Sequence, residues 1–159
     1  MAYIYPAPGV SNIQAVLTIT TNGGTDTVGL VVPALQDVTV NNANDVFTWT
    51  QLDSGSKQQI ATTATNSLGM NIVLEQDTFF GTAVSGEDAQ TAGIFGLSKD
   101  KTKIDFELYL GSTDGASTAD GKTISGSGYV TGLAPTVSAD APVWVSPITI
   151  TVDGDYTVS

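Results

Sequence analysis

Apolar and polar residues alternate along much of this chain, a pattern that is typical of β-strands with one buried face. The run from 103 to 110 follows it most regularly. Its apolar positions are Ile104, Phe106, Leu108 and Leu110, and the positions between them include Asp105 and Glu107. The run predicts a strand whose polar face carries these two carboxylates.

Two more alternating runs, at 13–21 and 25–32, are separated by Asn22, Gly23 and Gly24. Asparagine and glycine tolerate the positive φ angles that tight turns require. The segment 13–32 is therefore predicted to form a β-hairpin.

A shorter alternating pair, at 37–40 and 46–51, flanks the polar segment 41–45. We expect a second hairpin there, with its turn in the polar segment. Phe47 and Trp49 share one face of its second strand. They either pack into the core or lie on a projecting hairpin that buries them against another subunit, as aromatic residues often are at interfaces.

Four further runs complete the predicted strands, at 58–66, 68–76, 123–133 and 143–153. The run at 123–133 contains Gly126, Gly128 and Gly132. Glycine inside a strand marks a bend or a close approach of another backbone, so we expect one of these features there.

One helix is predicted, beginning at Ser85 and ending near Leu97. A serine at the N-cap, followed by Glu87 and Asp88, suits the unpaired N–H groups and the dipole of a first turn. The face packed on the sheet would carry Ala89, Ala92 and Phe95. Because two glycines lower its intrinsic stability by roughly 1 kcal/mol each, this helix depends on packing.

Roughly nine strands and one short helix predict a mostly β protein, either a two-sheet β-sandwich or a partly closed barrel, with one flanking helix. Residues 13–159 would form this single domain. Residues 1–12 have no helical or strand period and predict an extended arm that carries Tyr3, Ile4 and Tyr5. These side chains either dock on a neighbouring copy or belong to a frayed terminus.

The charge of the chain narrows the possible functions. Sixteen acidic residues oppose five lysines, with no arginine, and the net charge is −11. Since affinity for phosphate backbones comes from clustered Lys and Arg, this chain would repel a nucleic-acid duplex. The sequence has neither a signal peptide nor a run of about 20 apolar residues, so we expect a soluble protein with no membrane partner.

The chain contains no histidine and no cysteine. Serine triads, thiol nucleophiles and metal sites built from imidazole or thiolate are therefore excluded, and we expect no enzyme, no metal and no cofactor. The segment 153–155 alternates acid and glycine like a calcium loop, but turn formation explains it better. An alternative function is a carbohydrate-binding module with Trp49, Trp144 and Tyr109 as a sugar-stacking platform.

The order of elements in residues 55–155 resembles that of the major tail tube proteins of long-tailed, lambda-like bacteriophages. A strand at 69–75 leads to the helix-like segment EDAQTAGIFGL, the turn SKDKT and the strand KIDFELYLG; a glycine-containing strand, SGSGYVTGLAPTVSADAPV, then runs into VSPITITVDG. In that family the corresponding run is strand, helix, turn, strand, glycine-bearing strand and final amphipathic strand. The N-terminal third departs from the lambda pattern, because this chain begins almost at once with the hairpin at 13–32.

The resemblance implies a structural virion protein with the phage tail tube fold. Six copies would form a ring whose inner strands join into one barrel, and rings would stack into a tube through which genomic DNA passes. Other tail proteins would be further partners, and the subunit would be made in the host cytoplasm and located in the virion tail. A capsid decoration protein, or another virion surface protein, is the alternative.

The resemblance also suggests roles for individual residues. Asp105 and Glu107 are candidates for the lumen, although an outer solvated face suits them equally. Candidate contacts between subunits or between rings lie in the N-terminal arm and in the hairpin 35–53. They are Tyr3, Ile4, Tyr5, Asn42, Asp45, Phe47 and Trp49.

Overall fold

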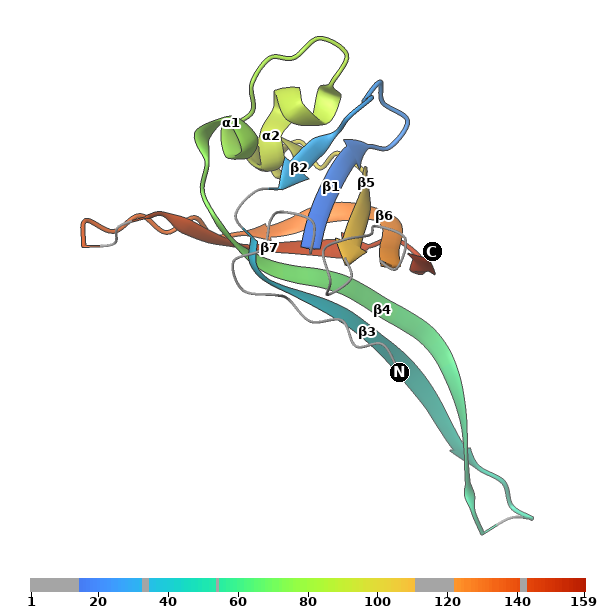
Figure 1. The fold of residues 1–159 in the computed structure, drawn as a ribbon. Coiled ribbons are helices and arrows are strands. Elements are labelled where there is room, and N and C mark those ends of the chain that lie inside the picture. The colour runs from blue at the N-terminus through green and yellow to red at the C-terminus, as the bar shows by residue number, and fades with distance from the viewer. Residues whose placement is uncertain (1–14, 33–34, 54, 111–121, 141–142) are drawn as a thin grey trace.

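The computed structural model describes residues 15–32, 35–53, 55–110, 122–140 and 143–159 (Figure 1). Their strands are β1 (Ala15–Thr21), β2 (Leu30–Val32), β3 (Leu35–Thr50), β4 (Lys57–Val73), β5 (Ile104–Leu110), β6 (Lys122–Leu133), β7 (Val145–Val152) and β8 (Thr157–Val158), and their helices are α1 (Gln76–Phe80) and α2 (Asp88–Lys99). The predicted mostly β class is confirmed. The predicted arm at 1–12, with Tyr3, Ile4 and Tyr5, lies outside the described residues.

The strands of the described segments form one antiparallel sheet in the order β2-β1-β5-β6-β7-β4-β3, with β8 paired to β6. The two-sheet sandwich is not confirmed, because one continuous path of paired strands joins them all. The sheet curls (Figure 1), so that β1 and β5 share a core with β4 and β7. This core includes Leu17, Ile19, Leu68, Ile72, Phe106, Leu108, Ile148 and Ile150. Each such side chain contributes about 1.5–3 kcal/mol of hydrophobic stabilisation.

Strand β6 carries the curl of the sheet. Its first half, up to Gly128, pairs with β5, and its second half, from Gly128, pairs with β7. At this crossover a Cβ added to Gly128 would lie 2.2 Å from the carbonyl oxygen of Thr151. The close approach predicted from the glycines of this strand is confirmed at Gly128.

Strands β1 and β2 form the predicted antiparallel hairpin, but β2 is shorter than expected. The predicted turn at Asn22 and Gly23 is present, since the N–H of Gly24 bonds to the carbonyl oxygen of Thr21 at 3.0 Å, but it opens a longer connection, 22–29, instead of leading directly into β2. The reason lies in the carboxylate of Glu87, which accepts hydrogen bonds from the backbone N–H groups of Thr27, Val28 and Gly29 at 2.9–3.0 Å. A side-chain acceptor thus takes donors that a regular hairpin would use between its strands.

The start of α2 also differs from the prediction. The helix begins at Asp88, and its N-cap residue, Glu87, makes no capping hydrogen bond with its side chain. Instead, Asp26 of the β1–β2 connection accepts a hydrogen bond from the backbone N–H of Ala89 at 2.8 Å. A residue distant in sequence performs the capping role that local sequence assigned to Ser85.

A kink divides α2, because Gly93 has a non-helical backbone with φ +68°. A Cβ at Gly93 would lie 2.3 Å from the backbone nitrogen of Gly81, which follows α1, so the two helices meet here without side chains between them. The kink places Ile94 and Leu97 in the core and exposes Phe95, which the sequence analysis wrongly placed on the packed face. Helix α1 itself was not predicted.

Strands β3 and β4, 16 and 17 residues long, form a single hairpin instead of the four shorter strands that were expected. The predicted turn at 41–45 is wrong: this segment continues β3, with a bulge between Asn44 and Val46, and the chain reverses at 51–56. Only residues 67–73 of β4 also pair with β7. Beyond them the hairpin leaves the body as a distal arm, residues 43–53 and 55–65 (Figure 1). Neither helix of the described segments is long and apolar enough to span a membrane.

Candidate assembly surfaces

The distal arm exposes apolar side chains to solvent. Phe47 and Trp49 are 59% and 37% exposed, and their rings stack with centroids 5.9 Å apart. Ile60, which pairs with Phe47 across the hairpin and therefore lies on the same face, is also exposed. Of the two interpretations drawn from the sequence, the core position of this aromatic pair is wrong. The hairpin projects as the other interpretation requires, and the burial of the pair against another subunit stays a prediction.

Asn42 and Asp45 lie within β3, away from the end of the hairpin where the sequence analysis had placed them. Asn42 pairs with Asn66 at the root of the distal arm. Asp45 occupies the bulge, and its carboxylate accepts a hydrogen bond from the hydroxyl of Thr63 at 3.0 Å. Both side chains are exposed, but a polar cross-strand role accounts for Asp45 within one copy.

The C-terminal segment holds the root of the distal arm. The hydroxyl of Tyr156 lies 2.7 Å from the carbonyl oxygen of Asn41 and 2.9 Å from that of Ser67, one on each strand of the hairpin. Burial raises the pKa of Tyr156, so the phenol keeps the proton that it donates there. The side-chain amide of Asn66 donates to the carbonyl oxygen of Gly154 at 2.9 Å. These contacts fix the direction in which the distal arm leaves the body.

A second exposed apolar surface lies at the other end of β4. Leu74, Phe80 and Trp144 line a hollow of about 460 Å³, with Glu75 and Gln76 beside them. Phe80 and Trp144 are 58% and 51% exposed. We call this surface the aromatic hollow. The aromatic hollow was not predicted, because the strand expected at 68–76 runs through Gln76, where the chain instead begins α1.

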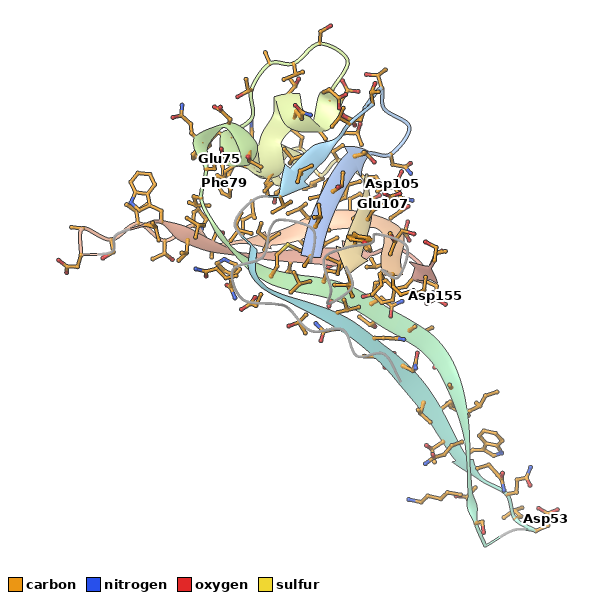
Figure 2. The ribbon with its side chains drawn as sticks, viewed as in Figure 1. Asp53, Glu75, Phe79, Asp105, Glu107 and Asp155 are labelled. Carbon is orange, nitrogen blue, oxygen red and sulfur yellow. The ribbon has the colours of Figure 1, made fainter. Side chains whose placement is uncertain are left out.

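Asp105 and Glu107 lie on the polar face of β5, as predicted, and Figure 2 places both on the body, away from the distal arm. Asp105 accepts hydrogen bonds from the side-chain amide of Asn22 at 3.0 and 3.1 Å and from the hydroxyl of Ser127. Glu107 is exposed. Lys103, the residue before β5, forms an ion pair with Asp153, with 2.8 Å between the Nζ atom and a carboxylate oxygen. This hydrogen bond and the charge of Asp153 raise the pKa of Lys103.

The described residues contain no group of three or more acidic side chains that could hold a metal ion. Asp153 and Asp155 are engaged in turn and side-chain contacts, with Lys103 and Asn66 respectively. Trp49 and Trp144 lie near opposite ends of β4, so they do not form one sugar-stacking platform.

No protein-family model matches the sequence, and no curated protein matches it significantly. Solved structures match in fold. A chain of the anti-feeding prophage baseplate has a TM-score of 0.65 at 10% identity, over 98% of this chain and 97% of that one. A chain of the native gene transfer agent virion has a TM-score of 0.60 at 11% identity, over 90% and 95%.

The SPP1 tail tube has a TM-score of 0.64 at 9% identity, over 94% of this chain and 78% of that one. This chain has a tail tube fold. The resemblance predicted from the order of elements is therefore confirmed at the level of the fold. Among the described residues, the distal arm and the aromatic hollow are two surfaces where exposed tryptophan and phenylalanine side chains lie together.

Proposed function

We propose that this chain is the tube subunit of a long-tailed phage, located in the virion tail after synthesis in the host cytoplasm. Six copies form a ring, and rings stack into a tube beside the other tail proteins. The observation that carries the proposal is the distal arm. A two-stranded hairpin is at best marginally stable in water by itself, and monomers rarely expose contiguous apolar surface of this kind without a partner.

The contact residues of this assembly are assigned on the same basis. Phe47 and Trp49 supply apolar contact area, and Asn42 and Asp45 supply polar contacts nearer the root of the distal arm. The N-terminal residues Tyr3, Ile4 and Tyr5 belong to the same proposal as contacts between subunits. Among the described strands, β3 is at an edge of the sheet. A neighbouring copy that covers this edge would also prevent uncontrolled edge-to-edge pairing.

For the inner wall of the tube, we assign the polar face of β5 with Asp105 and Glu107. A net charge of −11 supports this assignment, because an acidic wall repels DNA and lets it slide. The test is Glu107→Lys, an exposed position, with Asp53→Lys at the tip of the distal arm as the control (Figure 2). Tubes of Glu107→Lys should retain added linear DNA at low salt, whereas wild-type and Asp53→Lys tubes should not. Equal retention by both variants would remove Glu107 from the inner wall.

Negative-stain electron microscopy of the purified protein, over a range of salt concentrations, tests the proposed function itself. We expect six-fold rings or hollow tubes of uniform diameter. A capsid decoration protein would remain monomeric or trimeric under the same conditions. Monomers or trimers at every salt and protein concentration would overturn the proposal.

A further inference from the structure

In the part of the chain that the structure describes, each tryptophan lies with a phenylalanine in an exposed apolar group. One group is on the distal arm, around the stacked pair Phe47 and Trp49, and the other surrounds the aromatic hollow with Phe80 and Trp144. Gln58, which pairs with Trp49, and Leu74 in the hollow are sixteen residues apart on one continuous strand and its end. At about 3.3 Å per residue this is a separation of up to roughly 50 Å. One copy therefore cannot bring its own two groups together.

We propose that the Phe47–Trp49 pair of one copy packs into the aromatic hollow of a second copy. This inference rests on the proposed tube function and names the two surfaces that meet between successive copies. The contact is head-to-tail: every copy offers one aromatic pair and one hollow, so a single repeated contact covers both apolar groups throughout an open stack. A symmetric pairing of two arms would leave every hollow exposed.

The chemistry of the two surfaces favours a second copy as the occupant. Ile60 and Gln58 pair with Phe47 and Trp49 and share their face, so this group of four side chains is uncharged and suits an apolar hollow. Lys57, on the opposite face near the tip, is the nearest cation. The hollow lies beside the carboxylate of Glu75, and Asp77 follows in α1, so this end is acidic. Asp53 at the same tip offsets the charge of Lys57, so the apolar match between the two surfaces, and not their charge, favours this occupant.

The size of the contact agrees with a polymer and not with an isolated pair. Four aromatic side chains bury at most about 150–250 Å² each, or roughly 600–1,000 Å² together. A stable specific interface buries about 1,200–2,000 Å². One contact alone is therefore weak, and six parallel contacts between two rings would act together.

Cysteine cross-linking tests the contact directly, because the natural chain contains no cysteine. Gln58 adjoins Trp49 and Gln76 lies in the rim of the hollow. The double variant Gln58→Cys with Gln76→Cys, treated with a short bis-maleimide, should give a ladder of covalent multimers. Each single variant should give none. The control pairs Gln59→Cys, on the other face of the hairpin, with Gln76→Cys, and its yield should be several-fold lower.

Two results would overturn the inference. The first is tubes of the double variant that form normally but give no ladder, which means that another occupant fills the hollow. The second is covalent dimers of Gln58→Cys alone, which means that arms pair symmetrically. If the wild-type protein forms neither rings nor tubes, the proposed function has failed, and that outcome is distinct from both.

A mixing experiment gives a second, independent test. Phe47→Ser with Trp49→Ser removes the aromatic pair, and Phe80→Ser with Trp144→Ser removes the hollow. Each variant alone should form rings that do not stack, so mean tube length falls at least tenfold, while an equal mixture should give rings stacked only in pairs. Val28→Ser with Val158→Ser, at exposed positions outside both surfaces, should leave tube length unchanged. Full-length tubes of the Phe47→Ser, Trp49→Ser variant, whose substitutions lie outside the core, would by themselves overturn the inference.

Discussion

The curled body and the distal arm are built from the same alternating strand pattern, and they use it differently. In the body, Phe106 on β5 is 1% exposed because it lies inside the shared core, where the ring of Tyr156 packs beside it. On the distal arm, Phe47 occupies an equivalent alternating position and is mostly exposed. A period of two residues decides which side chains share a face, but only the surroundings decide whether that face is covered.

The largest expected effect is the loss of a body residue. Phe106→Ala should lower the free energy of unfolding by about 3–5 kcal/mol, because it leaves a cavity in the core. Ile60→Ala on the distal arm should change it by less than about 0.5 kcal/mol. Denaturant unfolding at protein concentrations where sedimentation shows monomers measures both. Similar losses for the two variants would mean that the distal arm contributes to the stability of one copy as the body does.

The same comparison explains which parts of the fold the sequence could predict. Strands β5, β6 and β7 were predicted within about two residues, because each has one buried face and therefore a clean alternation. The turn at 41–45 was wrong because its asparagines are favoured in turns but also suit a strand that is wet on both faces. Within the described residues that part of β3 is exposed, so local composition had no apolar pattern to oppose the turn.

The candidate surfaces divide in the same way. The spacing of Phe47 and Trp49 predicted that they share a face. The spacing of Asp105 and Glu107 predicted that both lie on the polar face of β5. The aromatic hollow depends on Phe80 and Trp144, which only the tertiary structure brings near one another. The contact of Glu87 with the β1–β2 connection is also nonlocal, and a local capping rule gave Glu87 a different role.

A smaller effect is expected at the junction of the two helices. Gly93→Ala should lower the free energy of unfolding by at least about 2 kcal/mol, since the backbone conformation costs about 1–3 kcal/mol without glycine and the new Cβ also meets Gly81. Gly86→Ala is the matched control: Gly86 has a positive φ too, but open space around its Cβ position. Gly86→Ala should lower the free energy of unfolding by less, and the difference between the two variants measures the cost of the contact with Gly81 apart from the backbone strain. Equal losses would show that α1 moves away without cost.

The connection between body and distal arm should yield a still smaller change. Tyr156→Phe removes one hydroxyl that bonds at the root, at a cost of about 1 kcal/mol. Amide hydrogen exchange should become faster at 41–42 and 66–67 and remain unchanged in β5. Phe should preserve the packing of the ring against Phe106, whose centroid is 6.4 Å away. If exchange accelerates throughout the sheet, Tyr156 supports the body as a whole and not the root alone.

The last comparison is a change of pH, which should act on the contact between α2 and the β1–β2 connection in the body. The three backbone hydrogen bonds from Gly29, Val28 and Thr27 lower the pKa of Glu87 in spite of its burial and the nearby charge of Asp26. Burial opposes the same change in Asp26, but hydrogen bonds from Thr21 and Ala89 outweigh it and lower the pKa of Asp26 as well.

Because the folded pKa is the lower one, the unfolded chain takes up protons first as the pH falls. The stabilisation by these two carboxylates is therefore fully present above the ordinary glutamate value of 4.5 and is lost as the pH drops through the lowered values. In unfolding measurements between about pH 5 and 3, Glu87→Gln should lose stability less steeply than the wild type. The exposed Glu107→Gln should follow the wild-type slope. Parallel slopes for wild type and Glu87→Gln would show that the contact between α2 and the β1–β2 connection does not depend on the charge of Glu87.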